Sequence, residues 1–243
     1  YSPVNDPNNV GEYHLTINNN QTGNVFTSKT LIVDSIRETG IIQPLGVPYY
    51  PVAYSPSNPA WYYLDLSNTT VKRDIRFVTV KDAREYNVVM RFHYRDFDLS
   101  GDSTDRFMDF NFPTLSCTYL YGGVELFVSY YSSDFYDVLY ASINPSTPNV
   151  LKRRAIKMDY IVVAGAQNFV DFLKISAPST TVAQDKPTYT NIDGGGYGIF
   201  SCRSRFHISK HLANATINHI ATKKPSCDLL FLDANGVPGA TCN

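Results

Sequence analysis

A run of glycines near the end of the chain restricts how residues 188–201 can fold. The segment reads Thr-Tyr-Thr-Asn-Ile-Asp-Gly-Gly-Gly-Tyr-Gly-Ile-Phe-Ser. Glycine adopts positive φ without a Cβ clash, and a short apolar run follows, so the segment predicts a tight turn that leads into a strand. A phosphate-binding loop would need its glycines to open a helix in a G-x-G-x-x-G or G-K-[ST] pattern, and neither pattern occurs. The segment therefore indicates backbone geometry and not a nucleotide site.

Alternation of apolar and polar residues predicts that much of the chain is β-strand. From Tyr86 to Tyr94 large apolar side chains fall on every second position, which is the pattern of a strand buried on one face. Glu12–Ile17 and Val25–Val33 predict an early hairpin, and Val124–Tyr130 predicts another strand after a Gly-Gly turn. We therefore expect an immunoglobulin-like β-sandwich portion over residues 1–115, incomplete at its N-terminus.

Two helices are expected in the second half. Apolar spacing predicts a helix over Asp134–Ile143, which Pro145 would end. A second helix is predicted from Ser209, as its N-cap, to Ala221. The predicted fold class is mainly β with an α+β C-terminal half: a mixed sheet with two helices over residues 116–225, then a disulfide-stapled hairpin over residues 226–243.

Composition agrees with a folded, exported protein and excludes several functions. The chain has 243 residues, of which 43% are hydrophobic and 18% charged, so it can bury a substantial core. Its 21 Lys and Arg residues are balanced by 22 Asp and Glu residues, which leaves no basic surface for nucleic acid. The longest apolar runs, such as Tyr160–Ala166, are far shorter than the roughly 20 residues of a membrane span.

The four cysteines predict two structural disulfides. Cys117, Cys202, Cys227 and Cys242 show no C-x-x-C spacing, which argues against a zinc site or a redox pair. Cys227 and Cys242 flank the turn-forming segment Asp233–Gly239, so they are expected to staple a hairpin, and Cys117 would then pair with Cys202. Four cysteines allow three connectivities, and the sequence does not choose among them. Disulfides indicate an oxidising compartment.

A proline-rich aromatic segment, Pro44–Asp65, is the first candidate binding site. Its five prolines restrict φ and remove backbone donors, which predicts a stiff excursion and not a simple strand. Aromatic rings on a stiff segment suit recognition of a protein or a sugar, but rings packed down on the sheet as a satellite core fit the pattern equally well. The rings that we expect to contact a partner are Tyr49, Tyr50, Tyr54, Trp61, Tyr62 and Tyr63.

Residues 96–105 form the second candidate site. Asp96, Asp98 and Asp102 match the start of a calcium-binding loop, because oxygen ligands alternate around a glycine. The twelfth position is Phe107, where such loops place a bidentate glutamate, and the flanking residues predict strands. Calcium is the one cofactor that the sequence suggests, and a polar hairpin tip is the interpretation that these two departures favour.

No pattern nominates a catalytic centre. His207 and His211 stand four residues apart, as two ligands on one helical face would, with His219 further on, but no H-E-x-x-H motif accompanies them. His93 beside Arg91 predicts a solvent-facing pair on a strand and not a general base. No G-x-S-x-G motif occurs. We therefore expect a protein that is not an enzyme.

Several segments resemble a domain-of-unknown-function family of Bacteroidota outer-membrane lipoproteins. Pro187–Ile192 and Gly196–Ser204 resemble the family signature P-x-Y-T-N-I followed by G-x-G-I-F-x-S-R. Lys81–Tyr94 resembles the family strand x-A-x-x-Y-x-V-x-x-R-F-x-Y. Asp134–Leu139 and Arg153–Val163 are also similar and lie in the family order.

This resemblance covers roughly residues 10–220 and implies a cellular setting. Family members carry an N-terminal lipid and are often encoded beside TonB-dependent outer-membrane transporters, with no chemistry established for them as a class. The chain begins at Tyr1 without a lipobox, so lipid anchoring, on the cell surface or the periplasmic face of the outer membrane, is expected from the resemblance alone. The cysteine-containing tail is not a feature of the family. Ser35 and Ser103 lie in Asp-Ser motifs that resemble O-glycosylation sites of that phylum.

Together these expectations describe an accessory lipoprotein that binds a TonB-dependent transporter or another outer-membrane assembly. The alternatives are a carbohydrate-binding module, which would stack sugars on the same aromatic rings, and a hydrolase. A hydrolase would require two carboxylates or a histidine pair to converge in a pocket.

Overall fold

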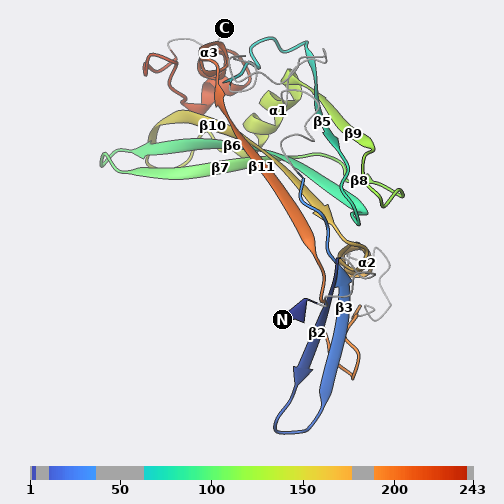
Figure 1. The fold of residues 1–243 in the computed structure, drawn as a ribbon. Helices are drawn as coiled ribbons and strands as arrows, with labels where there is room; N and C mark the ends of the chain where they lie inside the picture. The colour runs from blue at the N-terminus through green and yellow to red at the C-terminus, as the bar shows by residue number, and fades with distance from the viewer. Residues whose placement is uncertain (1, 4–10, 37–62, 177–188, 240–243) are drawn as a thin grey trace, which may run out of the picture.

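The computed structural model describes residues 2–3, 11–36, 63–176 and 189–239, and its fold is mainly β (Figure 1). The largest sheet is mixed and six-stranded, with the order β4-β11-β10-β6-β7 and β8 paired to β6. Every pairing in it is antiparallel except that of β4 with β11. Its strands are β4 (Tyr63–Leu64), β6 (Glu85–Asp98), β7 (Ser103–Asn111), β8 (Leu115–Ser116), β10 (Val150–Gly165) and β11 (Arg203–Leu212).

One face of this main sheet forms the core. Along β6 every second residue from Tyr86 to Asp96 is buried, as the sequence alternation predicted. This face is covered by α1 (Ser132–Ser142), by α3 (Asn214–Thr222) with the short 3-10 helix η3 (Ser226–Leu229), and by the paired strands β5 (Lys72–Val78) and β9 (Glu125–Tyr131). The ring of Phe92 packs against Phe135 of α1 and against Phe231 after η3.

The second half of the chain completes the sheet that the first half begins. Strands β10 and β11 pair side by side with β6, so the main sheet crosses the boundary expected at residue 115. The described strands of residues 1–115 consequently do not form a separate sandwich, and the early hairpin belongs to another sheet. The reason is long-range pairing: β6 and β10 are both long and both carry alternating large apolar residues, so each supplies the neighbour that the other needs.

One of the two predicted helices agrees with the structure and the other begins later than expected. The helix expected over 134–143 is present as α1. The helix expected from Ser209 begins only at Asn214, because residues 203–212 form strand β11. A helix that the sequence did not predict, α2 (Gln167–Ser176), follows β10. Among the described residues, no helix combines the length and the apolar character needed to span a bilayer.

An arm projects from the compact part of the molecule (Figure 1). It consists of the hairpin β2 (Glu12–Asn18) and β3 (Val25–Leu31), with β1 (Ser2–Pro3) paired to β2. The predicted early hairpin is therefore confirmed. A two-stranded ribbon is marginally stable on its own. Here residues 189–200, which we call the glycine segment, lie against it.

Backbone contacts explain the glycines of this segment. Thr27 and Asp193 exchange two backbone hydrogen bonds, and Ser28 Oγ donates to the Asn191 carbonyl at 2.6 Å. Gly194 has a φ of +85°, and a Cβ there would lie within 3.0 Å of the Val25 carbonyl oxygen. The glycine segment is thus a structural dock for the arm, and it ends two residues before strand β11 begins at Arg203.

Candidate binding face

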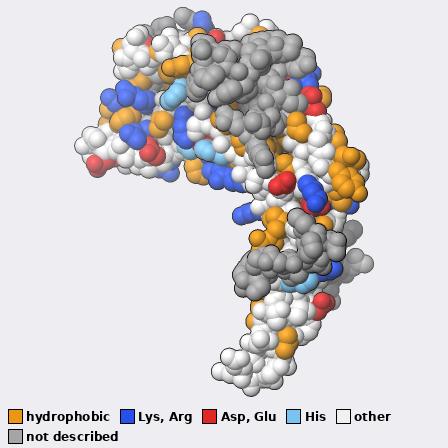
Figure 2. Space-filling view, in the orientation of Figure 1, with side chains coloured by type: hydrophobic (Ala, Val, Ile, Leu, Met, Phe, Trp, Pro, Cys, Tyr) orange, Lys and Arg blue, Asp and Glu red, His pale blue; other side chains and the backbone are white. Residues whose placement is uncertain are grey.

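The second face of the main sheet carries many charged and polar side chains, and most residues on it are partly or fully exposed. We call it the open face. Its Lys, Arg and His side chains come from β6, β10 and β11, and Figure 2 shows side chains of these types gathered over the sheet. Its residues on β6 and β7 are Asn87, Val89, Arg91, His93, Arg95, Asp105, Phe107, Asp109 and Asn111. Its residues on β10 and β11 are Lys157, Asp159, Ile161, Val163, Arg203, Arg205, His207, Ser209 and His211.

Cross-strand ion pairs order the β6–β7 side of the open face. Arg91 holds Asp109 with two hydrogen bonds of 2.7 and 2.8 Å, and Arg95 holds Asp105 with two of 2.6 and 3.0 Å. Each pair is directly opposite in the strand register, so the sheet itself sets the geometry. The guanidinium of Arg91 also stacks 4.1 Å from the ring centre of Phe107, which remains 57% exposed. This side therefore presents a fixed aromatic ring between charged neighbours.

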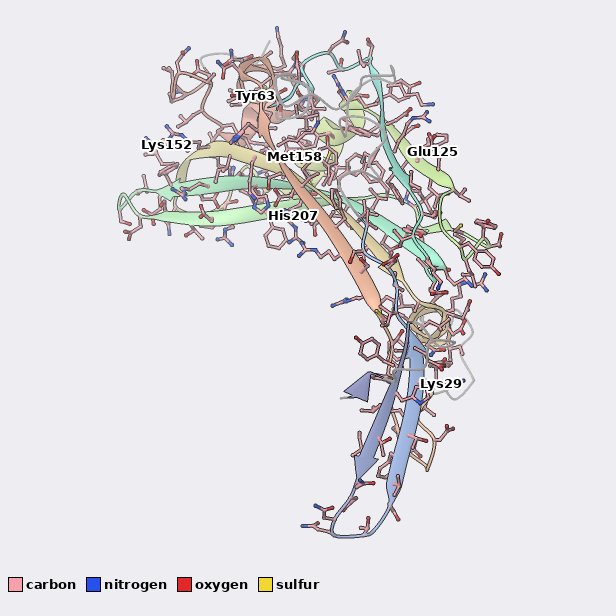
Figure 3. The ribbon with its side chains drawn as sticks, viewed as in Figure 1. Lys29, Tyr63, Glu125, Lys152, Met158 and His207 are labelled. Carbon is pink, nitrogen blue, oxygen red and sulfur yellow. The ribbon has the colours of Figure 1, made fainter. Side chains whose placement is uncertain are left out.

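The centre of the open face is a cluster around the carboxylate of Asp159. This residue is only 4% exposed. Its Oδ2 lies 2.7 Å from His93 Nε2 and 3.1 Å from His207 Nε2, and its Oδ1 accepts a hydrogen bond of 2.6 Å from Ser209 Oγ. Lys157 Nζ lies 2.9 Å from Oδ1. Three strands thus converge on one carboxylate, and Figure 3 labels His207 on β11.

These donors keep Asp159 ionised. Burial acts to raise the pKa of Asp159, but hydrogen bonds from Ser209, Lys157 and His207 and the nearby charge of His93 outweigh it and hold the pKa far below 3.8. Because the ionised carboxylate can only accept, each histidine Nε2 must carry its proton. Ser209 likewise donates to the carboxylate and not to a histidine, so the cluster lacks the serine–histidine contact that activates a nucleophile.

Beside this cluster lies a groove of about 420 Å³ that contains charged walls and an apolar floor. Arg91, Arg203 and Arg205 line its sides, and Val89, Ile161 and Val163 line its base. A second hollow of about 520 Å³ lies next to it, at the base of the arm. Arg203 lines both hollows. Among the described residues the lining thus consists of three arginines and three aliphatic side chains.

The aromatic segment cannot be placed from the described residues, except at its end. Tyr49, Tyr50, Tyr54, Trp61 and Tyr62 lie outside the described residues. Tyr63 begins β4 at the edge of the main sheet, is 52% exposed and lies 5.8 Å from the ring of His211. This one ring of the predicted set therefore borders the open face.

At the calcium loop suggested by Asp96, Asp98 and Asp102, the first carboxylate is already engaged by arginine side chains. Asp96 is 7% exposed, and its carboxylate accepts a hydrogen bond of 3.0 Å from Arg153 Nε. Asp98 instead organises the hairpin tip by accepting hydrogen bonds from the backbone of Ser100 and Asp102. Within the described residues no group of three or more His, Cys, Asp or Glu side chains could hold a metal ion. Residues 98–102 form a polar hairpin tip, the interpretation that Phe107 at the glutamate position favoured.

The disulfide expected between Cys117 and Cys202 is absent, and both cysteines are free. The backbone N–H of Cys117 donates a hydrogen bond to the carbonyl of Arg84, which directly precedes β6. The carbonyl of Cys202 accepts a hydrogen bond from the backbone N–H of Ala166, which directly follows β10. Three interstrand spacings of about 5 Å therefore separate the two residues, and a disulfide needs Cα atoms within about 7 Å. Cys227 is disulfide-bonded, and its predicted partner Cys242 lies outside the described residues.

The remaining predicted sites are simple to place. Ser35 and Ser103 are both exposed, as O-glycosylation would require. His207 and His211 share a face of strand β11, and not of a helix. The sequence did not reveal the Asp159 cluster. Its members come from positions 93, 157, 159, 207 and 209, and only the pairing of three strands unites them.

Comparison with protein-family models, curated proteins and solved structures found no match.

Proposed function

We propose that this protein is a non-enzymatic binding protein that contacts a partner protein through its open face. The observation that supports this proposal is the exposed ring of Phe107 held by Arg91 on a rigid sheet. Arginines and aromatic rings are the residue types enriched at protein interfaces. Because the ion pair with Asp109 already fixes the arginine, little side-chain entropy is lost when a partner docks.

The setting of this function follows from the resemblance described above. The protein would be a lipid-anchored accessory of the outer membrane, and its partner would be a TonB-dependent transporter or another β-barrel assembly. The exposed positions Ser35 and Ser103 are compatible with glycosylation at a cell surface.

The test is purification of the tagged full-length protein from native outer membranes in gentle detergent, with partners identified by mass spectrometry. We expect stoichiometric recovery of one β-barrel protein. Phe107→Ala should reduce that recovery at least about tenfold, as loss of an interface anchor does. Recovery of the protein alone would contradict the proposal and would direct attention to glycan binding.

Phe127→Ala provides a matched control. Phe127 is also an exposed ring, at 48%, and Arg76 stacks over it at 4.4 Å, but it lies on β9, outside the main sheet. Its replacement should leave partner recovery unchanged. If the Phe127 variant loses the partner and the Phe107 variant keeps it, the interface lies on the β5–β9 sheet and the open face is excluded.

A further inference from the structure

The groove on the open face has a chemical character of its own. Strand register sets Ile161 of β10 opposite Val89 of β6 and Val163 of β10 opposite Arg205 of β11, so the apolar floor lies on two adjacent strands and β11 borders it. The arginines rise from β6 and β11 on either side of this floor. A volume of about 420 Å³ is large enough for a few side chains of a bound segment.

The charge of the groove is not balanced from within the molecule. The carboxylates nearby are already engaged: Asp109 holds Arg91, and Glu85 pairs with Lys174 at 2.7 Å. Asp159 is saturated by its own four donors. Arg203 and Arg205 are exposed, and no hydrogen bond or ion pair joins either side chain to another residue in the described part of the chain. The groove therefore offers two guanidinium groups to a ligand.

Guanidinium groups bind carboxylates and phosphates, because the planar fork of donors matches two oxygens of either group. A broad polyanion such as nucleic acid or an anionic membrane would need a wide basic surface. The open face does not provide one, since Asp105 and Asp109 neutralise the neighbouring arginines and the whole chain has a net charge of −1. A local pair of carboxylates on an aliphatic segment fits the groove better.

We propose that the groove binds an acidic segment of the partner protein, with carboxylates on Arg203 and Arg205 and an aliphatic side chain on the floor of Val89, Ile161 and Val163. This inference rests on the proposed function, because it names the chemistry that the partner brings to the open face. The charge complementarity between two free guanidinium groups and an acidic segment is what selects this occupant.

The experiment uses the full chain labelled at isoleucine and valine methyl groups and observed by NMR. The probe is a blocked pentapeptide of two glutamates separated by valine, with leucine at both ends, and the control peptide has glutamine in place of both glutamates. The methyl signals of Val89, Ile161 and Val163 should shift on titration. The glutamate peptide should bind at least about tenfold more tightly than the glutamine peptide, and added salt should reduce this ratio.

Matched variants connect the binding to the two arginines. The double variant Arg203→Gln and Arg205→Gln should bring the two peptides to equal affinity. Arg154→Gln, which removes an exposed arginine of β10 outside the groove, should preserve the tenfold ratio. Methyl signals of the core residue Val88 report whether each variant is folded. Equal affinities in the wild-type protein, or no shift of the three floor methyls, would overturn the inference.

The two proposals can fail separately. If Phe107→Ala abolishes partner recovery while the glutamate peptide does not bind, the open face is an interface but the groove does not read acidic segments. If the peptide binds as expected and no partner is recovered from membranes, the groove has the stated chemistry and the proposed function is wrong.

Discussion

Replacing Gly194 with alanine should release the glycine segment from the arm. A Cβ at this position would lie within 3.0 Å of the Val25 carbonyl oxygen and 3.4 Å from the Cα of Phe26. These obstacles are backbone atoms, which cannot rotate out of the way as a side chain can. The glycine segment and strand β3 must therefore separate, and the backbone pair between Thr27 and Asp193 breaks first because it lies beside the contact.

The expected magnitude follows from two contributions. Alanine in the left-handed region costs roughly 1–2 kcal/mol relative to glycine. Loss of the two backbone hydrogen bonds, of 2.8 and 3.3 Å, costs about 1 kcal/mol each. We therefore expect the local docking free energy to fall by about 3 kcal/mol. Gly195→Ala is the control, because Gly195 also has positive φ, +79°, but no atom lies within 4 Å of its Cβ position, so only the first contribution applies.

Native-state hydrogen exchange at the amides of Thr27 and Asp193 measures this docking. In the Gly194 variant both amides should lose protection by about two orders of magnitude, whereas in the Gly195 variant they should lose about one. Amides of strand β6 should keep their protection in both proteins, since the main sheet is not involved. Equal loss of protection in the two variants would refute the argument that close backbone approach, and not φ alone, requires glycine at position 194.

Three further predictions concern buried groups. Arg153 is 1% exposed, and its guanidinium donates hydrogen bonds to Asp96 and to backbone carbonyls after α1 and in η3. Arg153→Leu should therefore lower the free energy of unfolding, measured by urea titration, by about 3–5 kcal/mol. A change below about 1 kcal/mol would contradict this prediction. Burial, with the charge of Arg73, lowers the pKa of Lys210 to about 7, so the unfolded chain holds a proton that the folded chain releases above pH 7. Stability should therefore rise by about 1 kcal/mol between pH 7 and 8, and Lys210→Met should flatten that rise when both proteins are unfolded at each pH. Alkylation of the unfolded, unreduced protein followed by peptide mass mapping should label both Cys117 and Cys202, because both are free thiols. A disulfide-linked peptide containing the two cysteines would contradict this prediction.

Short-range sequence patterns predicted several of the secondary-structure elements. The alternation from Tyr86 to Tyr94 identified β6 and the face that it buries, because five successive alternate positions carry large apolar side chains, and all five are buried. The early hairpin and helix α1 also followed from short-range spacing and turn residues. The signals that predict the secondary structure of these segments lie within their own sequence.

Strand β11 was hidden by a charge on its core face. The buried positions near its end are Lys210 and Leu212, and a lysine at a core position breaks the alternation that would signal a strand. His207 and His211 added to the ambiguity, since residues four apart share one face in a helix and in a strand alike. Only the pairing of β11 with β10, over nine successive positions, resolves it.

The candidate site was beyond the reach of sequence spacing for a related reason. Asp159 lies next to an apolar run, and nothing close to it in sequence indicates that His93 and His207 approach from two other strands. The same holds for the groove, whose walls come from positions 91, 203 and 205. A flat sheet assembles its sites across strands, so they become visible only once the strand order is known.

The glycine segment, which lies against the arm, leads into strand β11 of the open face. Asn191 exchanges hydrogen bonds of 2.8 Å with the backbone of Phe200, which closes the segment into a loop that ends just before β11. Arg203, the first residue of that strand, lines both the groove and the hollow at the base of the arm. A partner segment seated on Arg203 and Arg205 would thus continue directly toward Tyr13 of the arm, which lines the same hollow. The arm, which the glycine segment holds in place, would then extend the binding surface beyond the main sheet.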